Sequence, residues 1–267
     1  FLDDAYKNFD DKKESLAAGM KKAAAEIFAK CNLIVSYTAD DKGYELMSGL
    51  IKELIDKLSA EQLPVATRAL TLKKTRLALK TSGQVNFVCR VGDYDKAGIE
   101  YNGAMRILAN MMNSDYLWNN VRVKGGAYGC GAAFGSYSSS LGAFSSYRDP
   151  NLEKTNEIYD KAPEYVESFN ADEREMTKYV IGTISDLDLP KTPSVKGSDS
   201  FEAYISGLTE QMLQKERDEV LDATVEDIRA LSGMVKAVLD DGYFCVVGNE
   251  DKINEVKDMF DVIEPLA

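Results

Sequence analysis

The stretch that decides the fold class is residues 127–150, AYGCGAAFGSYSSSLGAFSSYRDP. Segments 127–134 and 141–148 have the pattern of two strands, and the polar turn between them joins them as a hairpin. The pair Asp149-Pro150 then favours the start of a helix, because aspartate can cap a helix and proline suits its first position. A hairpin followed directly by a helix predicts a sheet that carries helices.

The rest of the chain alternates predicted strands with predicted helices. Short apolar runs predict further strands over 33–37, 75–80, 84–91 and 243–248. Helical composition, spacing and capping signals predict helices over about 11–29, 40–58, 97–112, 151–169, 172–185, 199–221, 224–239 and 250–260. We therefore expect an α+β fold, in which helices pack on one face of a mixed, largely antiparallel sheet.

A distant internal repeat indicates how the chain divides. The order helix, strand, helix around 33–37 recurs around 244–248, and a repeat that far apart suggests homologous domains. A break at Pro64 separates the two, and the chain starts without an initiator methionine. We expect residues 1–62 to be the tail of a preceding homologous domain and 63–267 to be one complete domain of a longer protein. The alternative is that helix–strand–helix recurs by chance.

The composition excludes several kinds of chemistry. The 267 residues include no histidine, so His-ligated metal sites and Ser-His or Cys-His nucleophile pairs are impossible in this chain. With 32 Lys and Arg against 44 Asp and Glu, the net charge is −12, which repels nucleic acid and anionic membranes and attracts cationic ligands. No apolar run approaches the roughly 20 residues of a membrane span. No cysteine belongs to a C-x-x-C pair, so we expect reduced thiols buried in β-like runs: Cys31, Cys89, Cys130 and Cys245.

The segment with the strongest chemical signal ends a short predicted helix, which Asp115 would cap. Gly125 and Gly126 permit a tight turn with positive φ before the next strand. Arg122 brings a permanent cation with five donors and Tyr128 brings a hydroxyl on a rigid ring, which suits them to hold a peptide carbonyl or a developing oxyanion. The alternative is a surface arginine and a strand tyrosine beside a glycine turn. Similarly, Arg148-Asp149 is interpreted as a capped corner with a local ion pair.

The same segment resembles the C-terminal half of the insulinase/pitrilysin family of zinc metallopeptidases, most closely its presequence protease subfamily and the bacterial relatives of that subfamily. The similarity runs in order over most of residues 84–230. The matching motifs are Leu117-Trp118, Val121-Arg122-Val123-Lys124-Gly125-Gly126-Ala127-Tyr128-Gly129, Ser145-Ser146-Tyr147-Arg148-Asp149-Pro150-Asn151, Pro193-Ser194-Val195-Lys196-Gly197 and Tyr204-Ile205-Ser206-Gly207-Leu208.

The resemblance implies a ferredoxin-like α/β sandwich domain and a role for individual residues. Family members have two halves that close around an acidic chamber, and an H-x-x-E-H motif in the first domain binds zinc. By motif position, Arg122 would hold a substrate carbonyl, Tyr128 would bind the substrate or the tetrahedral intermediate, and Gly125, Gly126 and Ala127 would contact the substrate. Without histidine this chain cannot hold that zinc, so we expect no metal site and no cofactor here, and zinc in the missing N-terminal half.

The resemblance, the net charge and the cysteine usage together imply partners and a compartment. The partners would be the N-terminal half of the same polypeptide and short, unstructured, cationic peptides, with no nucleic acid and no membrane. The isolated chain would be inactive, and the intact protein would be a hydrolase in the bacterial cytoplasm or an organellar matrix. Two alternatives stay open at this point: a non-catalytic structural or partner subunit of the same family, and an unrelated acidic α+β binding module.

Overall fold

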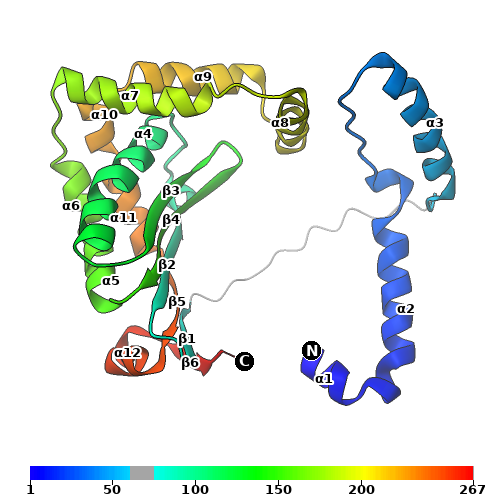
Figure 1. Cartoon of the computed structure of the whole chain (residues 1–267), viewed down its shortest axis with the longest axis horizontal. Helices are drawn as coiled ribbons and strands as arrows, with labels where there is room; N and C mark the ends of the chain where they lie inside the picture. The colour runs from blue at the N-terminus through cyan, green and yellow to red at the C-terminus, as the bar shows by residue number, and fades with distance from the viewer. Residues whose placement is uncertain (61–74, 267) are drawn as a thin grey trace. The chain divides into compact units, whose positions relative to one another are not determined.

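The computed structural model describes residues 1–60 and 75–266, which form two compact units. The larger unit contains residues 75–190 and 203–266, and the smaller contains residues 1–60 and Lys191–Glu202. The predicted domain boundary at 62/63 lies outside the described residues. Each unit is described by itself below (Figure 1).

The larger unit is built on one six-stranded mixed sheet in the order β3-β4-β2-β5-β1-β6. The hairpin predicted from residues 127–150 forms its first two strands, and β3, β4, β2 and β5 pair antiparallel. β1 pairs parallel with both β5 and β6. The strands are β1 (Arg76–Thr81), β2 (Asn86–Asp93), β3 (Gly129–Ser136), β4 (Ser139–Asp149), β5 (Tyr243–Asn249) and β6 (Val262–Pro265).

Helices cover one face of this sheet, as Figure 1 shows. Burial alternates along the strands: Val88 and Phe144 are buried beneath the helices, whereas Phe87 and Tyr147 on the opposite face are exposed. The predicted α+β class is therefore confirmed. The helices of this unit are α4 (Ala104–Met111), α5 (Glu153–Asp160), α6 (Ala162–Glu167), α7 (Glu173–Leu187), α9 (Glu210–Leu221), α10 (Val225–Ala230), α11 (Ser232–Asp240) and α12 (Glu250–Glu255), with 3-10 turns η2 (Tyr94–Ala97) and η5 (Lys257–Met259).

Two glycines let α11 approach the sheet closely. Gly92 on β2 and Gly142 on β4 are opposite each other in the ladder, and both face Val238 of α11. A Cβ atom on Gly92 would lie 2.0 Å from the Val238 carbonyl oxygen, and one on Gly142 would lie 2.4 Å from its Cγ2 atom. The buried Val238 therefore occupies the space that two side chains would take.

Several predicted element ends differ from the structure. Asp149 does not cap a helix, since it is buried and α5 starts only at Glu153. The predicted helix over 151–169 is divided at Lys161, before Pro163. The predicted helix over 199–221 is divided around Gly207, whose φ is +69°. The capping box of Thr224 with Asp227 is present as predicted.

The smaller unit consists of helices without a core. It contains α1 (Leu2–Lys7), α2 (Phe9–Ile27), a 3-10 turn η1 (Lys30–Asn32), α3 (Asp41–Lys57) and residues 193–202 of α8 (Pro193–Ser206). Asp40 caps α3 as expected, its side chain accepting a hydrogen bond from the Gly43 backbone N–H at 2.9 Å. In its described residues Ala29 alone is buried. The exposed apolar side chains include Phe9, Met20, Phe28, Ile34, Val35, Tyr44, Leu46, Met47, Leu50 and Leu54.

The predicted strand over 33–37 is wrong. These residues follow η1 without regular secondary structure, and no described strand pairs with them. The expectation of a buried thiol in a β-like run is wrong for Cys31, which is exposed on η1, whereas Cys89, Cys130 and Cys245 lie on strands and are partly buried. Among the described helices, none has the length and apolarity needed to cross a membrane.

Candidate functional site

The candidate site begins on a helical run that winds into wider turns. After α4 the backbone forms two π-helical segments, η3 (Met112–Tyr116) and η4 (Trp118–Val123). The Lys124 N–H bonds the Asn119 carbonyl five residues earlier, at 3.0 Å. Such π turns often occur at functional sites. Asp115, expected to cap a new helix here, lies instead inside this continuous run.

A two-glycine turn ends the run. Gly126 has a φ of +80°, and its N–H donates to the Arg122 carbonyl at 3.0 Å. A Cβ atom on Gly125 would lie 2.5 Å from the Val121 carbonyl oxygen. The Asn151 amide donates to the Gly125 carbonyl at 2.5 Å and holds the turn from outside. The turn therefore needs glycine at both positions, for different reasons.

The Arg122 guanidinium is held in place by this turn. Its Nη1 atom donates to the Ala127 carbonyl at 2.7 Å. Its Cζ atom lies 5.3 Å from the ring centroid of Trp118 and 5.3 Å from that of Tyr128, so the cation lies between two aromatic rings. Among the described residues, Arg122 forms no ion pair with a carboxylate, which leaves most of its donors available to a ligand.

Tyr128 presents its ring and hydroxyl to solvent. The side chain is 64% exposed, and its hydroxyl makes no hydrogen bond within the described part of the chain. Arg148 lies 5.9 Å from the ring centroid, so the tyrosine has one guanidinium from Arg122 and a second from Arg148. Ala127 is fully buried, and it serves the site through the carbonyl that holds Arg122.

Two further residues, Phe87 and Tyr147, extend the site, and the sequence predicted a role for neither of them. The Tyr147 ring packs edge-on against Tyr128 at 5.9 Å, and Phe87 packs against Tyr147 at 5.2 Å. Phe87, Tyr147 and Tyr128 are exposed, and Trp118 is exposed as well. The period-two pattern of β2 and β4 could have placed Phe87 and Tyr147 on one face, but it could not show which face the helices leave uncovered. We call Phe87, Tyr147, Tyr128 and Trp118 the aromatic strip.

Arg148 also differs from its expected role in a corner ion pair. Among the described residues it is the single non-glycine with a positive φ, +49°, and it pairs with no carboxylate. Strained backbone of this kind is found at functional sites. The neighbouring Asp149 is buried and accepts hydrogen bonds from the Asn151 N–H at 2.9 Å and the Thr155 hydroxyl at 2.7 Å. Burial raises the pKa of Asp149 despite these donors.

The arrangement can hold an extended peptide. Two guanidinium groups and a phenol offer donors to carbonyl oxygens, and the aromatic strip offers apolar faces to side chains. Groups of three or more potential metal-ligating His, Cys, Asp or Glu side chains are absent from the part of the chain that the structure describes.

Residues 76–249 match the family model of the PreP C-terminal domain, which covers the whole sheet except β6 together with the Arg122–Tyr128 turn. The chain belongs to this family. The expected membership in the C-terminal half of the insulinase/pitrilysin peptidases is confirmed, and an unrelated α+β binding module is excluded.

Two curated relatives are similar over nearly the full chain. Protein HypA of Clostridium perfringens is 41% identical over 96% of this chain, and presequence protease 1, chloroplastic/mitochondrial, of Arabidopsis thaliana is 30% identical over 100% of it. The chain spans about a quarter of the length of each relative, 26% and 25% respectively.

Solved structures share the fold at low identity. A peptidase M16 inactive domain from Pseudomonas fluorescens aligns with a TM-score of 0.54 and 14% identity, covering 77% of this chain and 51% of the other. A protease from Helicobacter pylori aligns with a TM-score of 0.52 and 16% identity, covering 76% of this chain and 52% of the other. At this identity the likeness concerns the fold alone.

Proposed function

We propose that this chain is the substrate-clamping C-terminal part of a zinc metalloendopeptidase that degrades short unstructured peptides in a closed chamber. One observation carries the proposal. The Arg122 guanidinium is fixed by the Ala127 carbonyl between two exposed rings, yet it has no carboxylate partner among the described residues. An arginine that is ordered without an ion pair is ready to bind an external acceptor. The family match and the similarity to presequence protease 1 support the peptidase context.

Each residue has a distinct role in this proposal. Arg122 donates to a substrate carbonyl, and Tyr128 donates from its hydroxyl to the substrate or to the oxyanion that forms at the scissile carbonyl. Arg148 adds a second positive charge near the Tyr128 ring. Gly125 and Gly126 set the geometry of the turn that carries both groups.

Zinc supplies the activated water in peptidases of this kind. The described residues do not fit a zinc site, because the chain has no histidine and no cluster of three potential ligands is found among them. We therefore assign zinc to the N-terminal part of the intact protein and derive no step through the metal in this chain.

The smaller unit supports the N-terminal part as a partner. Its exposed apolar side chains, such as Leu50 and Leu54 on α3, have no core to enter, and the strand-like residues 33–37 pair with no described strand. A preceding domain could cover these apolar side chains, and a strand of its sheet could pair with residues 33–37. This is the proposed role of residues 1–62 as the tail of that domain.

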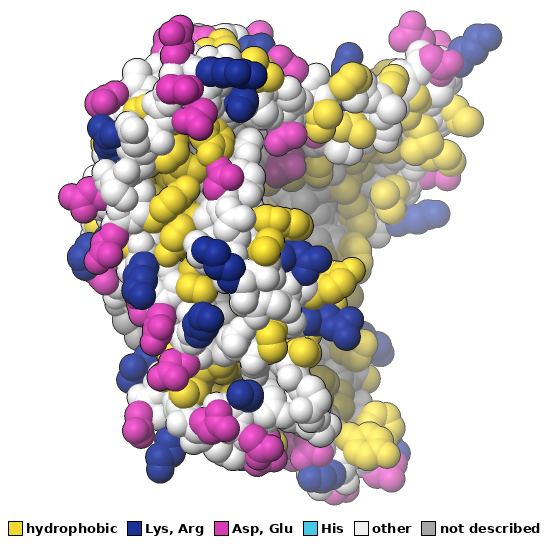
Figure 2. Space-filling view, turned by 60° about the vertical axis from the view of Figure 1, so that its left-hand side comes forward, with side chains coloured by type: hydrophobic (Ala, Val, Ile, Leu, Met, Phe, Trp, Pro, Cys, Tyr) yellow, Lys and Arg dark blue, Asp and Glu magenta, His cyan; other side chains and the backbone are white. Residues whose placement is uncertain are grey.

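The charge supports cationic peptides as substrates. Acidic and basic side chains are interspersed on the face of the larger unit that Figure 2 shows, and the net charge is −12. A negative potential over the chain would raise the local concentration of cationic peptides. We propose the bacterial cytoplasm or an organellar matrix as the compartment.

A complementation experiment tests the proposal. The purified chain alone should hold no stoichiometric zinc and cleave no peptide. Mixed with the separately expressed N-terminal part of the intact protein, it should restore hydrolysis of an unstructured cationic peptide. The Arg122→Ala chain should fail to do so, whereas Arg174→Ala, which changes an exposed arginine on α7, should succeed. Stoichiometric zinc in the chain, or equal rescue by Arg122→Ala, would contradict the proposal. Absence of the H-x-x-E-H motif upstream would favour the non-catalytic subunit instead.

A further inference from the structure

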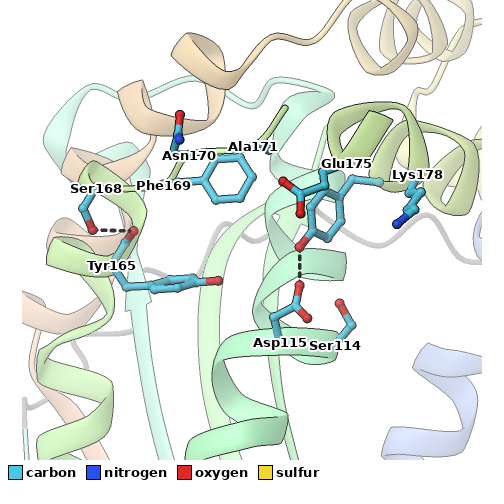
Figure 3. Close-up of a pocket in the computed structure, with 10 residues that line it drawn as sticks. Ser114, Asp115, Tyr165, Ser168, Phe169, Asn170, Ala171, Glu175 and Lys178 are labelled. Atoms are coloured by element: carbon cyan, nitrogen blue, oxygen red, sulfur yellow. Dashed lines mark hydrogen bonds between the residues drawn. The ribbon is translucent and has the colours of Figure 1, made fainter. Parts of the chain in front are cut away.

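A second site lies in a hollow of about 610 Å³ between helices of the larger unit. Figure 3 shows its walls. Asp115 comes from the π-helical segment η3, Tyr165 from α6, Phe169 from the segment between α6 and α7, and Glu175 and Tyr179 from α7. The volume is in the range of small-molecule sites, about 300–1,000 Å³.

Three aromatic rings form its apolar walls, and the fold fixes each of them. Tyr165 stacks one ring face on Tyr116 at 4.5 Å, and Figure 3 shows the ring lying across the hollow. The Phe169 and Tyr179 rings meet edge-on at 6.0 Å. The Arg229 guanidinium donates from Nε to the Phe169 carbonyl at 2.6 Å and so holds that wall from behind. Ordered ring faces of this kind attract cations.

Two carboxylates give the hollow negative charge. The Tyr179 hydroxyl donates to Oδ2 of Asp115, as the dashed line in Figure 3 shows, and burial together with this hydrogen bond raises the pKa of Tyr179. Oε2 of Glu175 accepts from the Asp172 N–H at 3.2 Å in the capping box of α7. Each carboxylate is thus oriented through one oxygen. The other oxygens, Oδ1 of Asp115 and Oε1 of Glu175, accept no hydrogen bond within the described residues.

We propose that this hollow binds a guanidinium group, presented by an arginine side chain. A guanidinium is planar, so it can lie on an aromatic face while its edge donors reach two carboxylates. An ammonium cannot stack in this way, and a quaternary ammonium cannot donate hydrogen bonds. A bare metal ion fits less well, since no three potential ligands of the usual types come together in the described chain. Lys178 also lines the hollow, but it is exposed and forms no ion pair with a described residue.

This site is separate from the aromatic strip, although one helical run carries part of both. Asp115 lies on η3 and Arg122 on η4, and no residue that lines the hollow belongs to the strip. The proposal therefore does not depend on the peptidase function.

A titration of the whole chain with N-acetyl-L-argininamide, followed by ¹⁵N–¹H NMR, tests the site. We expect saturable shifts centred on residues 114–116 and 165–179, with a Kd on the order of 1–10 mM for a half-exposed pocket. N-acetyl-L-citrullinamide has the same shape without the charge, and it should bind at least about 10-fold more weakly. An arginine within a capped tripeptide should match argininamide if peptides are the source, and bind markedly more weakly if the site accepts free arginine derivatives alone.

Matched variants locate the binding. Glu175→Gln keeps an acceptor for the capping box, and Asp115→Asn keeps one for Tyr179, so both should fold. Each should weaken argininamide binding at least about 3-fold. Glu173→Gln removes the same charge from the same turn of α7 outside the hollow, and it should change the Kd less than about 2-fold. Equal binding of citrullinamide, shifts confined to residues other than 114–116 and 165–179, or equal weakening by Glu173→Gln would overturn the proposal.

Discussion

Gly126 is the residue whose backbone shapes the turn between Arg122 and Tyr128. Its φ of +80° is a conformation that an L side chain adopts only with strain. Gly126→Ala should therefore lower the free energy of unfolding by about 1–2 kcal/mol, as measured by urea denaturation.

Gly233→Ala is the matched control for this change. Gly233 lies in α11 with open space where a Cβ would stand, so alanine should leave stability unchanged or raise it by up to about 1 kcal/mol. Equal effects of the two substitutions would show that the positive φ of Gly126 is not required.

Asp149 makes stability depend on pH in a direction opposite to that of most carboxylates. Burial raises the pKa of Asp149 above its ordinary value of 3.8, so the folded state retains a proton that the unfolded chain has lost. The contribution of Asp149 to the free energy of unfolding is therefore lost as pH rises from its unfolded-state pKa through its raised folded-state pKa. Asp149→Asn cannot titrate. Its free energy of unfolding relative to the wild type should rise from about pH 4 to about pH 7, and a difference that is constant with pH would contradict this.

At the scale of elements, the packing of α11 on the sheet depends on Gly142 and Val238. Gly142→Ala places a methyl group against the Val238 side chain and should cost about 1–3 kcal/mol. In a Val238→Ala background that cost should fall by at least about 1 kcal/mol, measured as a double-mutant cycle of unfolding free energies.

Gly92→Ala is the control for this cycle. Its clash is with the Val238 backbone carbonyl, so shortening the Val238 side chain should not relieve it. If Val238→Ala leaves the cost of Gly142→Ala unchanged, the side chain is not what requires glycine on β4.

Elements with a strong local pattern were predictable from the sequence, and elements that depend on partners were not. The hairpin of β3 and β4 and the capping box at Thr224 have local causes, and the structure contains both. Segment 33–37 has a strand-like composition, but a strand needs a neighbour for its ladder. The sequence could not show that Asp149 would be enclosed, and the four-residue β6 has too little pattern to be found.

The candidate site divides in the same way. Arg122, Gly125, Gly126 and Tyr128 are adjacent in sequence, so one motif points to all of them. Phe87 and Tyr147 join them only because β2 and β4 pair in the folded sheet. The guanidinium-binding hollow combines residues from three separate elements and leaves no local signal in the sequence.

Across the whole molecule, the two units differ in whether they have a buried hydrophobic core. The larger unit has a continuous buried core, whereas Ala29 is the one buried residue among those described in the smaller unit. The chain also spans about a quarter of the length of its curated relatives. Both observations support the proposal that the chain is one part of a larger peptidase.

The most direct test of this account is the kcat/KM of the intact protein toward an unstructured cationic peptide. Arg122→Ala and Tyr128→Phe should each lower kcat/KM by roughly 10²-fold or more, because both groups would act on the transition state. Arg174→Ala should leave it unchanged. Wild-type kcat/KM in both the Arg122→Ala and Tyr128→Phe proteins would contradict the account.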